Sequence, residues 1–154
     1  MSHPDYKVRI ASWCADRLAL QTVRRVVFIE EQNVPEAMEW DEFDETCVHV
    51  IAIDIHGVPI GTGRLIADHP LSRIGRMAVL PGWRGKGIGA ALLDLLLTLA
   101  RERKDHGIEI HAQTHAMVFY ARSGFVPDGP EFDEAGIPHR MMRLTFPPRL
   151  TFPP

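Results

Sequence analysis

Three glycines and two cations stand within six residues near the middle of this 154-residue chain, at positions 84–89 (RGKGIG). A short apolar run at 76–80 precedes them, and apolar residues recur at helical spacing from Ile88 onward. Glycines let a ligand approach the backbone, and the first turn of a helix offers unpaired N–H groups and the positive end of the helix dipole. The stretch therefore predicts an anion site, with phosphate or pyrophosphate as the expected ligand.

Two other phosphate motifs use the same residue types. A Walker A loop is excluded because Gly87 follows Lys86 where Ser or Thr belongs, and Leu80 stands where the first glycine belongs. A dinucleotide fingerprint fits the letters of residues 85–90, with Glu109 as its downstream acid. However, four residues separate the apolar run from the first glycine, and the chain is too short for a dinucleotide domain and a substrate domain. This second reading is therefore disfavoured.

The hydrophobic pattern predicts the elements that position this site. Asp16 is expected to cap a first helix that runs to about Ile29, and Pro35 restricts any helix in the following acidic stretch to short pieces. Further helices are expected over 88–104 and 115–123, and strands at 6–12, 48–55, 58–66, 76–80, 107–114, from 125 and at 139–146, with a loop at 127–138. This order predicts an α/β (α+β) fold, with a mixed central sheet of about six to seven strands flanked by helices.

Composition bounds the partners and the setting. The net charge is −3 and the basic residues form no long stripe, so a nucleic-acid partner is not expected. No apolar run is long enough to predict a membrane span, and the N-terminus lacks an apolar signal core. Cys14 and Cys47 lack metal-ligand spacing, which favours a reduced, cytoplasmic setting and no metal. One domain is expected over 1–146, followed by a tail at 147–154 that contains the second copy of a repeated RLTFPP.

A second motif lies about 30 residues beyond the glycines. Ala116, Phe119, Tyr120, Gly124 and Phe125 form the pattern A-x-x-F-Y-x-x-x-G-F. Together with R-x-x-G-x-G in the first motif, this pattern resembles the signature of the GCN5-related N-acetyltransferase (GNAT) family. The segments VFIEEQNVPEAMEWDEFDE, GTGRL, IGRMAV and GIPHRMM resemble, more narrowly, its ElaA/YjcF-like branch. The resemblance covers nearly the whole chain and implies the acyl-CoA N-acyltransferase fold.

The resemblance implies that acetyl-CoA is the co-substrate. The backbone of Met77, Ala78 and Val79 would pair with the pantetheine arm as if it were another strand. The residues that would hold the pyrophosphate are Arg84, Gly85, Lys86, Gly87, Ile88 and Gly89. Phe119 would belong to the same site, and Gln113 stands where the family often has an asparagine that contacts pantetheine. Tyr120 would be the general acid that gives a proton to the departing CoA thiolate.

The acceptor is expected beside residues 30–45, half of which are acidic and none of which is Lys or Arg. A primary amine of a small molecule or peptide must lose a proton before it attacks, because an ammonium has no lone pair and its pKa in water is about 10.4. The candidate bases are Glu31 and His49, and the candidate substrate contacts are Glu39, Trp40 and Asp41. A solvated loop is the alternative for this segment.

Direct attack in a ternary complex is expected, since no nucleophile constellation surrounds either cysteine. Two alternatives stay open: an acetyl-CoA-binding sensor without turnover, and an acyltransferase that takes a longer acyl donor. A homodimer is also left open. His111 and His115 are interpreted as structural histidines.

Overall fold

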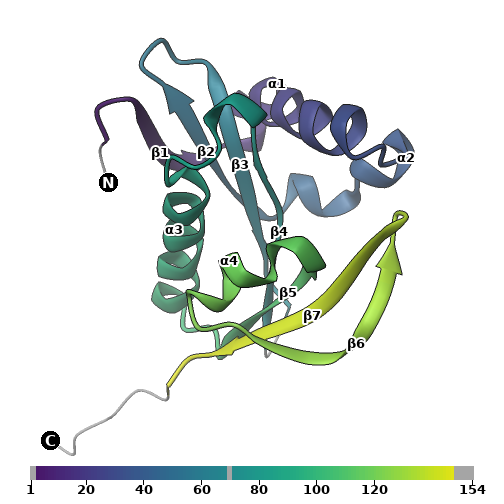
Figure 1. Ribbon diagram of the computed structural model, residues 1–154. Helices are drawn as coiled ribbons and strands as arrows, with labels where there is room; N and C mark the ends of the chain where they lie inside the picture. Colours follow the sequence, from purple (N-terminus) through teal and green to yellow (C-terminus); the bar gives the residue numbers. More distant parts are fainter. Residues whose placement is uncertain (1–2, 69–70, 148–154) are drawn as a thin grey trace, which may run out of the picture.

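The computed structural model describes residues 3–68 and 71–147, and within them seven strands form one mixed sheet (Figure 1). The strands are β1 (Tyr6–Ala11), β2 (Val48–Asp54), β3 (Pro59–Ile66), β4 (Ser72–Val79), β5 (Gly107–Gln113), β6 (Val126–Glu134) and β7 (Ile137–Thr145). The α-helices are α1 (Trp13–Arg24), α2 (Glu36–Glu39), α3 (Ile88–Glu102) and α4 (Met117–Ala121). The shorter or wider helical turns are η1 (Arg25–Glu31), η2 (Glu42–Glu45), η3 (Pro81–Trp83) and η4 (Thr114–Ala116).

The sheet order is β1-β2-β3-β4-β5-β7-β6, and among the strands that the structure describes only the neighbours β4 and β5 run parallel. The predicted α/β fold with a mixed sheet of six to seven strands is therefore confirmed. No helix among the described residues combines the length and the apolar character needed to cross a membrane. Apart from Pro147, the predicted tail at 147–154 lies outside the described residues.

Helices lie on both faces of the sheet (Figure 1). One face of α3 packs against β1 to β4 and buries Ile88, Leu92 and Leu96 in the largest core. On the other face, α1 and η1 pack against β3 and β4 and bury Val23 and Val27 in a smaller core.

Two glycines of β3 set how closely α3 approaches the sheet. A Cβ atom at Gly61 would lie 3.0 Å from Cδ1 of Leu92, and one at Gly63 would lie 2.9 Å from Cδ1 of Leu96. A side chain at either position would force these leucines of α3 to shift away from the sheet. The sequence GTG in this strand is therefore a packing requirement, which brings the start of α3 against the end of β4.

The first helix begins earlier than predicted. Ser12 is its N-cap, and the Ser12 Oγ accepts a hydrogen bond from the Ala15 N–H. Asp16 lies in the first turn, where it accepts a bond of 2.8 Å from the Ser12 N–H and pairs with Arg9 at 2.9 Å. The prediction of Asp16 as the N-cap is wrong, because this carboxylate supports the cap from one turn inside the helix. The helix then continues as a π-helix to Glu31, a geometry often found at functional sites.

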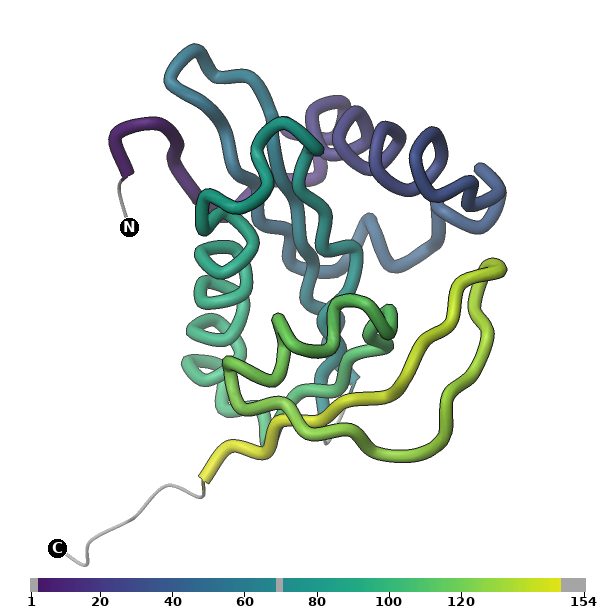
Figure 2. Tube along the Cα trace, in the orientation of Figure 1, coloured from purple at the N-terminus to yellow at the C-terminus, as the bar shows by residue number. Residues whose placement is uncertain are grey.

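The prediction of a loop at 127–138 is also wrong, because these residues form the β6–β7 hairpin. Its turn lies at Ala135 and Gly136, both with positive φ. A register shift between Pro127 and Glu131 accommodates two prolines, which are tolerated because β6 is an edge strand whose outer side needs no ladder partner. The hairpin reaches past the body of the sheet, and its turn lies on the side of the molecule where α2 is found (Figures 1 and 2).

Candidate active site

β4 and β5 separate soon after they begin to pair. Their parallel register covers only residues 72–74 and 108–110. β4 then bulges at Arg76, whose φ is 51°, and its register with β3 shifts at the same point. Beyond the bulge, the strand continues beside β3, while no described strand pairs with the other edge of Met77, Ala78 and Val79. This gap therefore offers an unpaired strand edge to an extended ligand.

The glycine loop lies at the end of this gap. η3 follows β4 directly, and Gly87 is the N-cap of the 15-residue helix α3. Gly85 and Gly87 have φ values of 78° and 85°, a left-handed conformation that other residues adopt at a cost. Residues 84–87 are exposed, and the free N–H groups of the first helical turn follow directly after the two cations Arg84 and Lys86 in the chain.

Arg84 connects the glycine loop to the end of β4 and to η1. Its Nε donates to the Val79 carbonyl at 3.0 Å, and its Nη1 donates to Oε2 of Glu31 at 2.7 Å. The hydrogen bond from Arg84 lowers the pKa of Glu31, which is therefore a charged and ion-paired carboxylate. Glu31, one of the two predicted bases, thus lies at the rim of the gap and is joined to the predicted donor site.

Tyr120 and Phe119 lie on the α3 side of the sheet. The Phe119 ring would be 3.3 Å from a Cβ atom at Gly89, so the two motifs meet in space. Tyr120 is 7% exposed and packs edge-on against Phe119 and Phe125. Burial raises the pKa of Tyr120 to about 12, so the phenol keeps its proton throughout the physiological range.

Gln113 joins β5 to the π-helix η1. Its Nε2 donates to Oε1 of Gln32 at 2.8 Å, and η1 ends one residue before Gln32. This contact identifies the face of β5 that carries Gln113 as the face turned toward η1. The gap is therefore bordered by the glycine loop and α4 on one side and by η1 on the other.

The acidic stretch is held to the sheet by three arginines that the sequence reading did not connect with it. We call the six side chains the arginine–carboxylate cluster: Arg24 of α1, Arg64 of β3, Arg76 of β4, and Glu39, Asp41 and Asp44. The ion pairs join Arg24 to Glu39 and Asp44 at 2.7 Å each, Arg64 to Asp41 and Asp44 at 2.7 and 2.9 Å, and Arg76 to Glu39 and Asp41 at 3.1 and 3.2 Å. Three positive and three negative groups neutralise one another there.

At this cluster, the predicted substrate contacts are buried or already in contact with arginines. Glu39 is 2% exposed, and Asp41 is bonded by both Arg64 and Arg76. The guanidinium groups of Arg24 and Arg25 both lie over the ring of Trp40, 5.2 and 5.6 Å from its centre. A signal was present in the sequence, since arginines inside apolar strands rarely stay unpaired, but the sequence alone does not identify their partners.

His49, the other predicted base, is 2% exposed. Its Nε2 lies 2.8 Å from the carbonyl of Asp44, and its ring stacks on Trp13 at 4.9 Å. Burial lowers the pKa of His49, so the ring is neutral and its Nε2–H donates to that carbonyl. β2 is also separated from β4 by β3 in the sheet. His49 thus contacts the cluster through the backbone of Asp44, on the side away from β4.

Asp44, Cys47 and His49 bring ligand atoms within 4.8 Å of one another. However, two guanidinium groups already bond the oxygens of Asp44. Burial also raises the pKa of the Cys47 thiol to about 11. A protonated thiol and two neighbouring cations favour an ion-pair network at this position over a metal ion.

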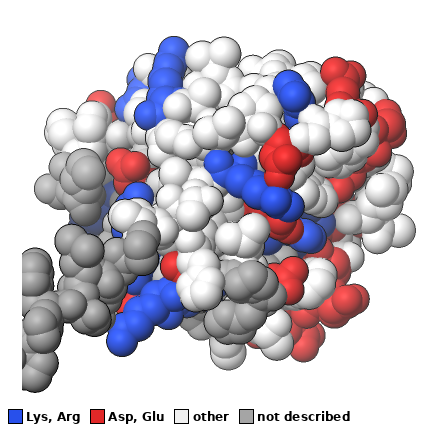
Figure 3. Space-filling model, turned by 90° about the horizontal axis from the view of Figure 1, so that it is seen from below, with Lys and Arg blue, Asp and Glu red and all other residues white. Residues whose placement is uncertain are grey.

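Acidic side chains gather on one side of the surface (Figure 3), the side on which α2 and the hairpin turn lie in Figure 1. The exposed acids of these two regions include Glu36, Glu42, Glu45, Glu131 and Asp133. The arginine–carboxylate cluster neutralises the buried acids, whereas the exposed acids lie at the surface outside the cluster. The approach to the η1 side of the gap is thus negatively charged, which favours a cationic ligand.

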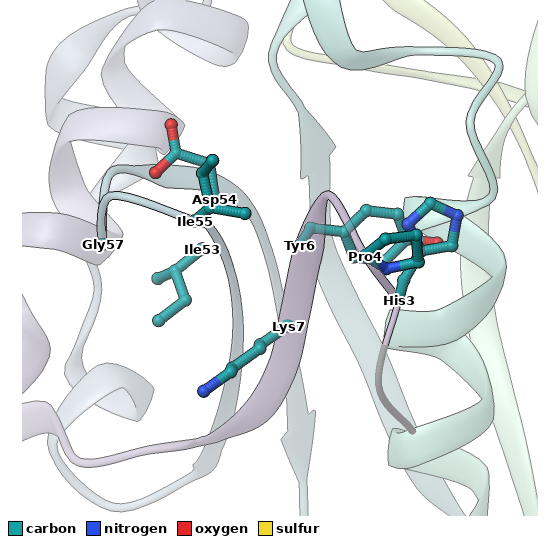
Figure 4. Close-up of a pocket in the computed structure, with 8 residues that line it drawn as sticks. All are labelled: His3, Pro4, Tyr6, Lys7, Ile53, Asp54, Ile55 and Gly57. Atoms are coloured by element: carbon teal, nitrogen blue, oxygen red, sulfur yellow. The ribbon is translucent and has the colours of Figure 1, made fainter.

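A separate hollow of about 180 Å³ lies at the β1 edge of the sheet (Figure 4). Its lining includes His3, Tyr6, Lys7 and Asp54, and the rings of His3 and Tyr6 stack at 4.3 Å. The Tyr6 hydroxyl donates to the carbonyl of Lys86 at 3.2 Å. Tyr6 therefore joins this hollow to the glycine loop, but the lining of the hollow does not include the unpaired edge of β4.

Comparison with known proteins agrees with this geometry. A family model described as Acetyltransferase (GNAT) domain matches residues 14–146. The uncharacterized N-acetyltransferase YjcF of Bacillus subtilis (strain 168) is 36% identical over 121 residues, which cover 78% of this chain and 86% of YjcF. A crystal structure of an acyl-CoA N-acyltransferase from Pseudomonas aeruginosa has a TM-score of 0.80 at 28% identity and covers 90% of this chain and 98% of that chain. Escherichia coli ElaA has a TM-score of 0.79 at 26% identity, with the same two coverages.

Proposed function

Since the chain belongs to the GNAT family of acetyltransferases, we propose that it transfers the acetyl group of acetyl-CoA to a primary amine of a small molecule or peptide, by direct attack in a ternary complex. One observation carries the proposal: the gap between β4 and β5 opens beside the glycine loop at the start of α3. An extended arm with an anionic end matches these two features, because the strand edge pairs with the arm and the helix N-terminus binds the anion.

In the proposed complex, the pantetheine arm lies along Met77, Ala78 and Val79. The pyrophosphate is held by Arg84, Gly85, Lys86, Gly87, Ile88 and Gly89. Arg84 must leave the Val79 carbonyl for the arm to pair with it, and its charge is then available to the phosphates. Gln113 and Phe119 border the gap from the η1 side and the α4 side and would contact the arm there.

Tyr120 is proposed to donate a hydrogen bond from its hydroxyl group to the sulfur as the thiolate forms. A phenol with a pKa of about 12 remains protonated, which keeps this donor available. A thiol is the stronger acid, with an ordinary pKa of about 8.5, so donation of a hydrogen bond stabilises the thiolate without complete proton transfer. The proton that the sulfur finally holds then comes from the attacking nitrogen.

The acceptor amine is proposed to approach from the η1 side, across the acidic surface. Glu39, Trp40 and Asp41 would form the wall of its site, with their positions fixed by the arginine–carboxylate cluster. Glu31 can serve as a base only after Arg84 has released it, because an ion-paired carboxylate accepts protons weakly. His49 is too enclosed to meet a ligand, and we assign it to the support of Asp44.

The experiment is a donor and acceptor panel. The protein is mixed with acetyl-CoA and ethylamine, 1,4-diaminobutane, phenethylamine, lysine or a lysine-containing peptide, and both thiol release and acetylated product are measured. We expect equal amounts of thiol and N-acetyl product with at least one amine. If CoA binds in calorimetry but no amine causes release of the CoA thiol from acetyl-CoA, the sensor is favoured. Faster turnover with hexanoyl-CoA than with acetyl-CoA would favour a longer acyl donor.

A pair of glycine variants locates the donor in this experiment. Gly89→Val should lose CoA affinity, since its Cβ atom would already lie 3.3 Å from the Phe119 ring at the start of α3. Gly82→Val is the matched control, because a Cβ atom at Gly82 has no described neighbour within 4 Å. Equal CoA affinity in both variants would contradict the proposed pyrophosphate site.

A further inference from the structure

A histidine and a glutamate face each other beside the gap. Nδ1 of His111, on β5, lies 3.0 Å from Oε1 of Glu134, the last residue of β6. His111 directly follows Ile110, the last β5 residue that pairs with β4. His111 and Gln113 are two residues apart on one strand, so they share a face, and Gln113 turns that face toward η1. His111 therefore lies where the gap opens, on its η1 side.

This contact fixes which nitrogen of His111 is basic. A carboxylate only accepts hydrogen bonds, so the hydrogen must be on Nδ1 of His111. In the neutral ring, the lone pair is then on Nε2, and no described residue hydrogen-bonds to that atom. The carboxylate also stabilises the imidazolium that forms when Nε2 takes a proton. The pair thus has the geometry of an oriented base.

The surroundings hold Glu134 ionised and in place. The hydrogen bond from His111 lowers the pKa of Glu134, and the charges of His139 and Arg76 act in the same direction. Nε2 of His139 lies 3.6 Å from Oε2 of Glu134, while Nδ1 of His139 donates to the Ile137 carbonyl at 2.7 Å. The Phe132 ring packs edge-on against His111 and stacks on His139, at 5.3 and 5.9 Å.

We propose that His111, oriented by Glu134, is the base that deprotonates the acceptor amine, an inference that rests on the proposed acetyl transfer. It revises the interpretation of His111 as structural. Compared with the two bases predicted from the sequence, His111 is favoured by its free nitrogen. Glu31 is ion-paired with Arg84, and His49 is enclosed, whereas the His111 side chain is 26% exposed.

Nε2 of His111 takes one proton from the ammonium, and the freed lone pair forms a bond from nitrogen to the carbonyl carbon of the thioester. The carbon–sulfur bond breaks, and its electron pair leaves with the CoA sulfur. The nitrogen then loses a second proton, which the sulfur receives, while His111 returns the first proton to solvent. The products are an N-acetyl amine, CoA thiol and one proton.

Two amines of matched shape test this role. Ethylamine is charged at neutral pH and needs a base, whereas 2,2,2-trifluoroethylamine is uncharged because its fluorines withdraw electrons. His111→Asn retains an N–H near the position of Nδ1 but has no basic nitrogen at Nε2, and His111→Gln is a second variant. For ethylamine, both variants should lower kcat/KM by about 10²-fold, the usual contribution of a general base. For trifluoroethylamine, the loss should be clearly smaller.

His106→Asn is the control, because the His106 side chain is exposed and its backbone carbonyl accepts a hydrogen bond from the Phe146 N–H, which the substitution leaves in place. It should behave like the wild type with both amines. An equal loss with the two amines, or no loss in either variant, would overturn the role of His111 while leaving the proposed acetyl transfer intact. If the wild type binds CoA but acetylates neither these amines nor the wider panel, the proposed function itself fails, and the role of His111 fails with it.

Discussion

Arg84 and Glu31 join the glycine loop to the π-helix, so the two sides of the gap are in direct contact. The guanidinium group donates to both carboxylate oxygens of Glu31, and its Nε covers the Val79 carbonyl. The same arginine therefore contacts the strand edge proposed for pantetheine and the helix proposed to border the acceptor. In the proposed complex, binding of the donor would rearrange this contact and so couple the two proposed halves of the site.

Glu31→Gln should bind CoA more tightly than the wild type. The variant removes the charge that competes with phosphate for Arg84, and an exposed ion pair is worth at most about 1 kcal/mol, so we expect up to about fivefold lower Kd. Calorimetry at low salt measures the change, and added salt should reduce it. Glu30→Gln, one residue earlier and also exposed, is the control. Weaker CoA binding by Glu31→Gln would mean that Glu31 holds Arg84 in its binding position.

Tyr120→Phe should slow the reaction without weakening donor binding. The substitution removes only the hydroxyl, so the packing of the ring against Phe119 and Phe125 is retained. We expect kcat to fall by about 10²-fold, because the forming thiolate loses its hydrogen-bond donor. Steady-state kinetics with the best amine of the panel gives kcat, and calorimetry gives the Kd for CoA. An unchanged kcat would exclude Tyr120 from the chemical step.

The same variant should also alter stability in alkali. Burial raises the pKa of Tyr120 to about 12, whereas an unfolded tyrosine ionises near pH 10. Above pH 10 the unfolded chain loses this proton first, so the free energy of unfolding falls as the pH rises toward 12. At pH 11 the wild type should have lost about 1.4 kcal/mol relative to Tyr120→Phe. Urea unfolding at pH 9 and pH 11 measures this, and parallel curves for the two proteins would contradict the burial of the phenol.

The elements that form the proposed donor half of the site could be predicted from the sequence because their signals are local. Glycines that follow an apolar run at fixed spacing determine the loop and the start of α3, whatever the rest of the chain does. The pattern around Phe119 and Tyr120 is equally short. Their meeting at Gly89 follows from the order of the elements, since parallel β4 and β5 need a crossover helix between them.

The side-chain contacts of the proposed acceptor half could not be predicted, because they join residues far apart in the chain. Arg24, Arg64 and Arg76 come from three elements, and their ion pairs are formed only when α1 packs on the sheet. The pairing of His111 with Glu134 was hidden for a different reason. The prolines of β6 are typical of a loop in the sequence. They are compatible with a strand because β6 lies at the edge of the sheet, and this strand brings Glu134 to His111 of β5.

Arg24 and its neighbour Arg25 provide a test of the arginine–carboxylate cluster. Arg24 is 1% exposed and bonds Glu39 and Asp44, whereas Arg25 is exposed and pairs with Glu36 at 2.6 Å. Both guanidinium groups also lie over the ring of Trp40, so loss of that contact is common to the two variants.

Arg24→Met should lower the free energy of unfolding by about 3 kcal/mol or more, because it leaves buried carboxylates without one of their cations. Arg25→Met should cost much less, because the ion pair that it removes is exposed to solvent. Urea unfolding of the two variants and the wild type at pH 7 measures both changes. If the two substitutions cost the same, the cluster does not hold the acidic segment on the sheet, and the wall proposed for the acceptor site loses its support.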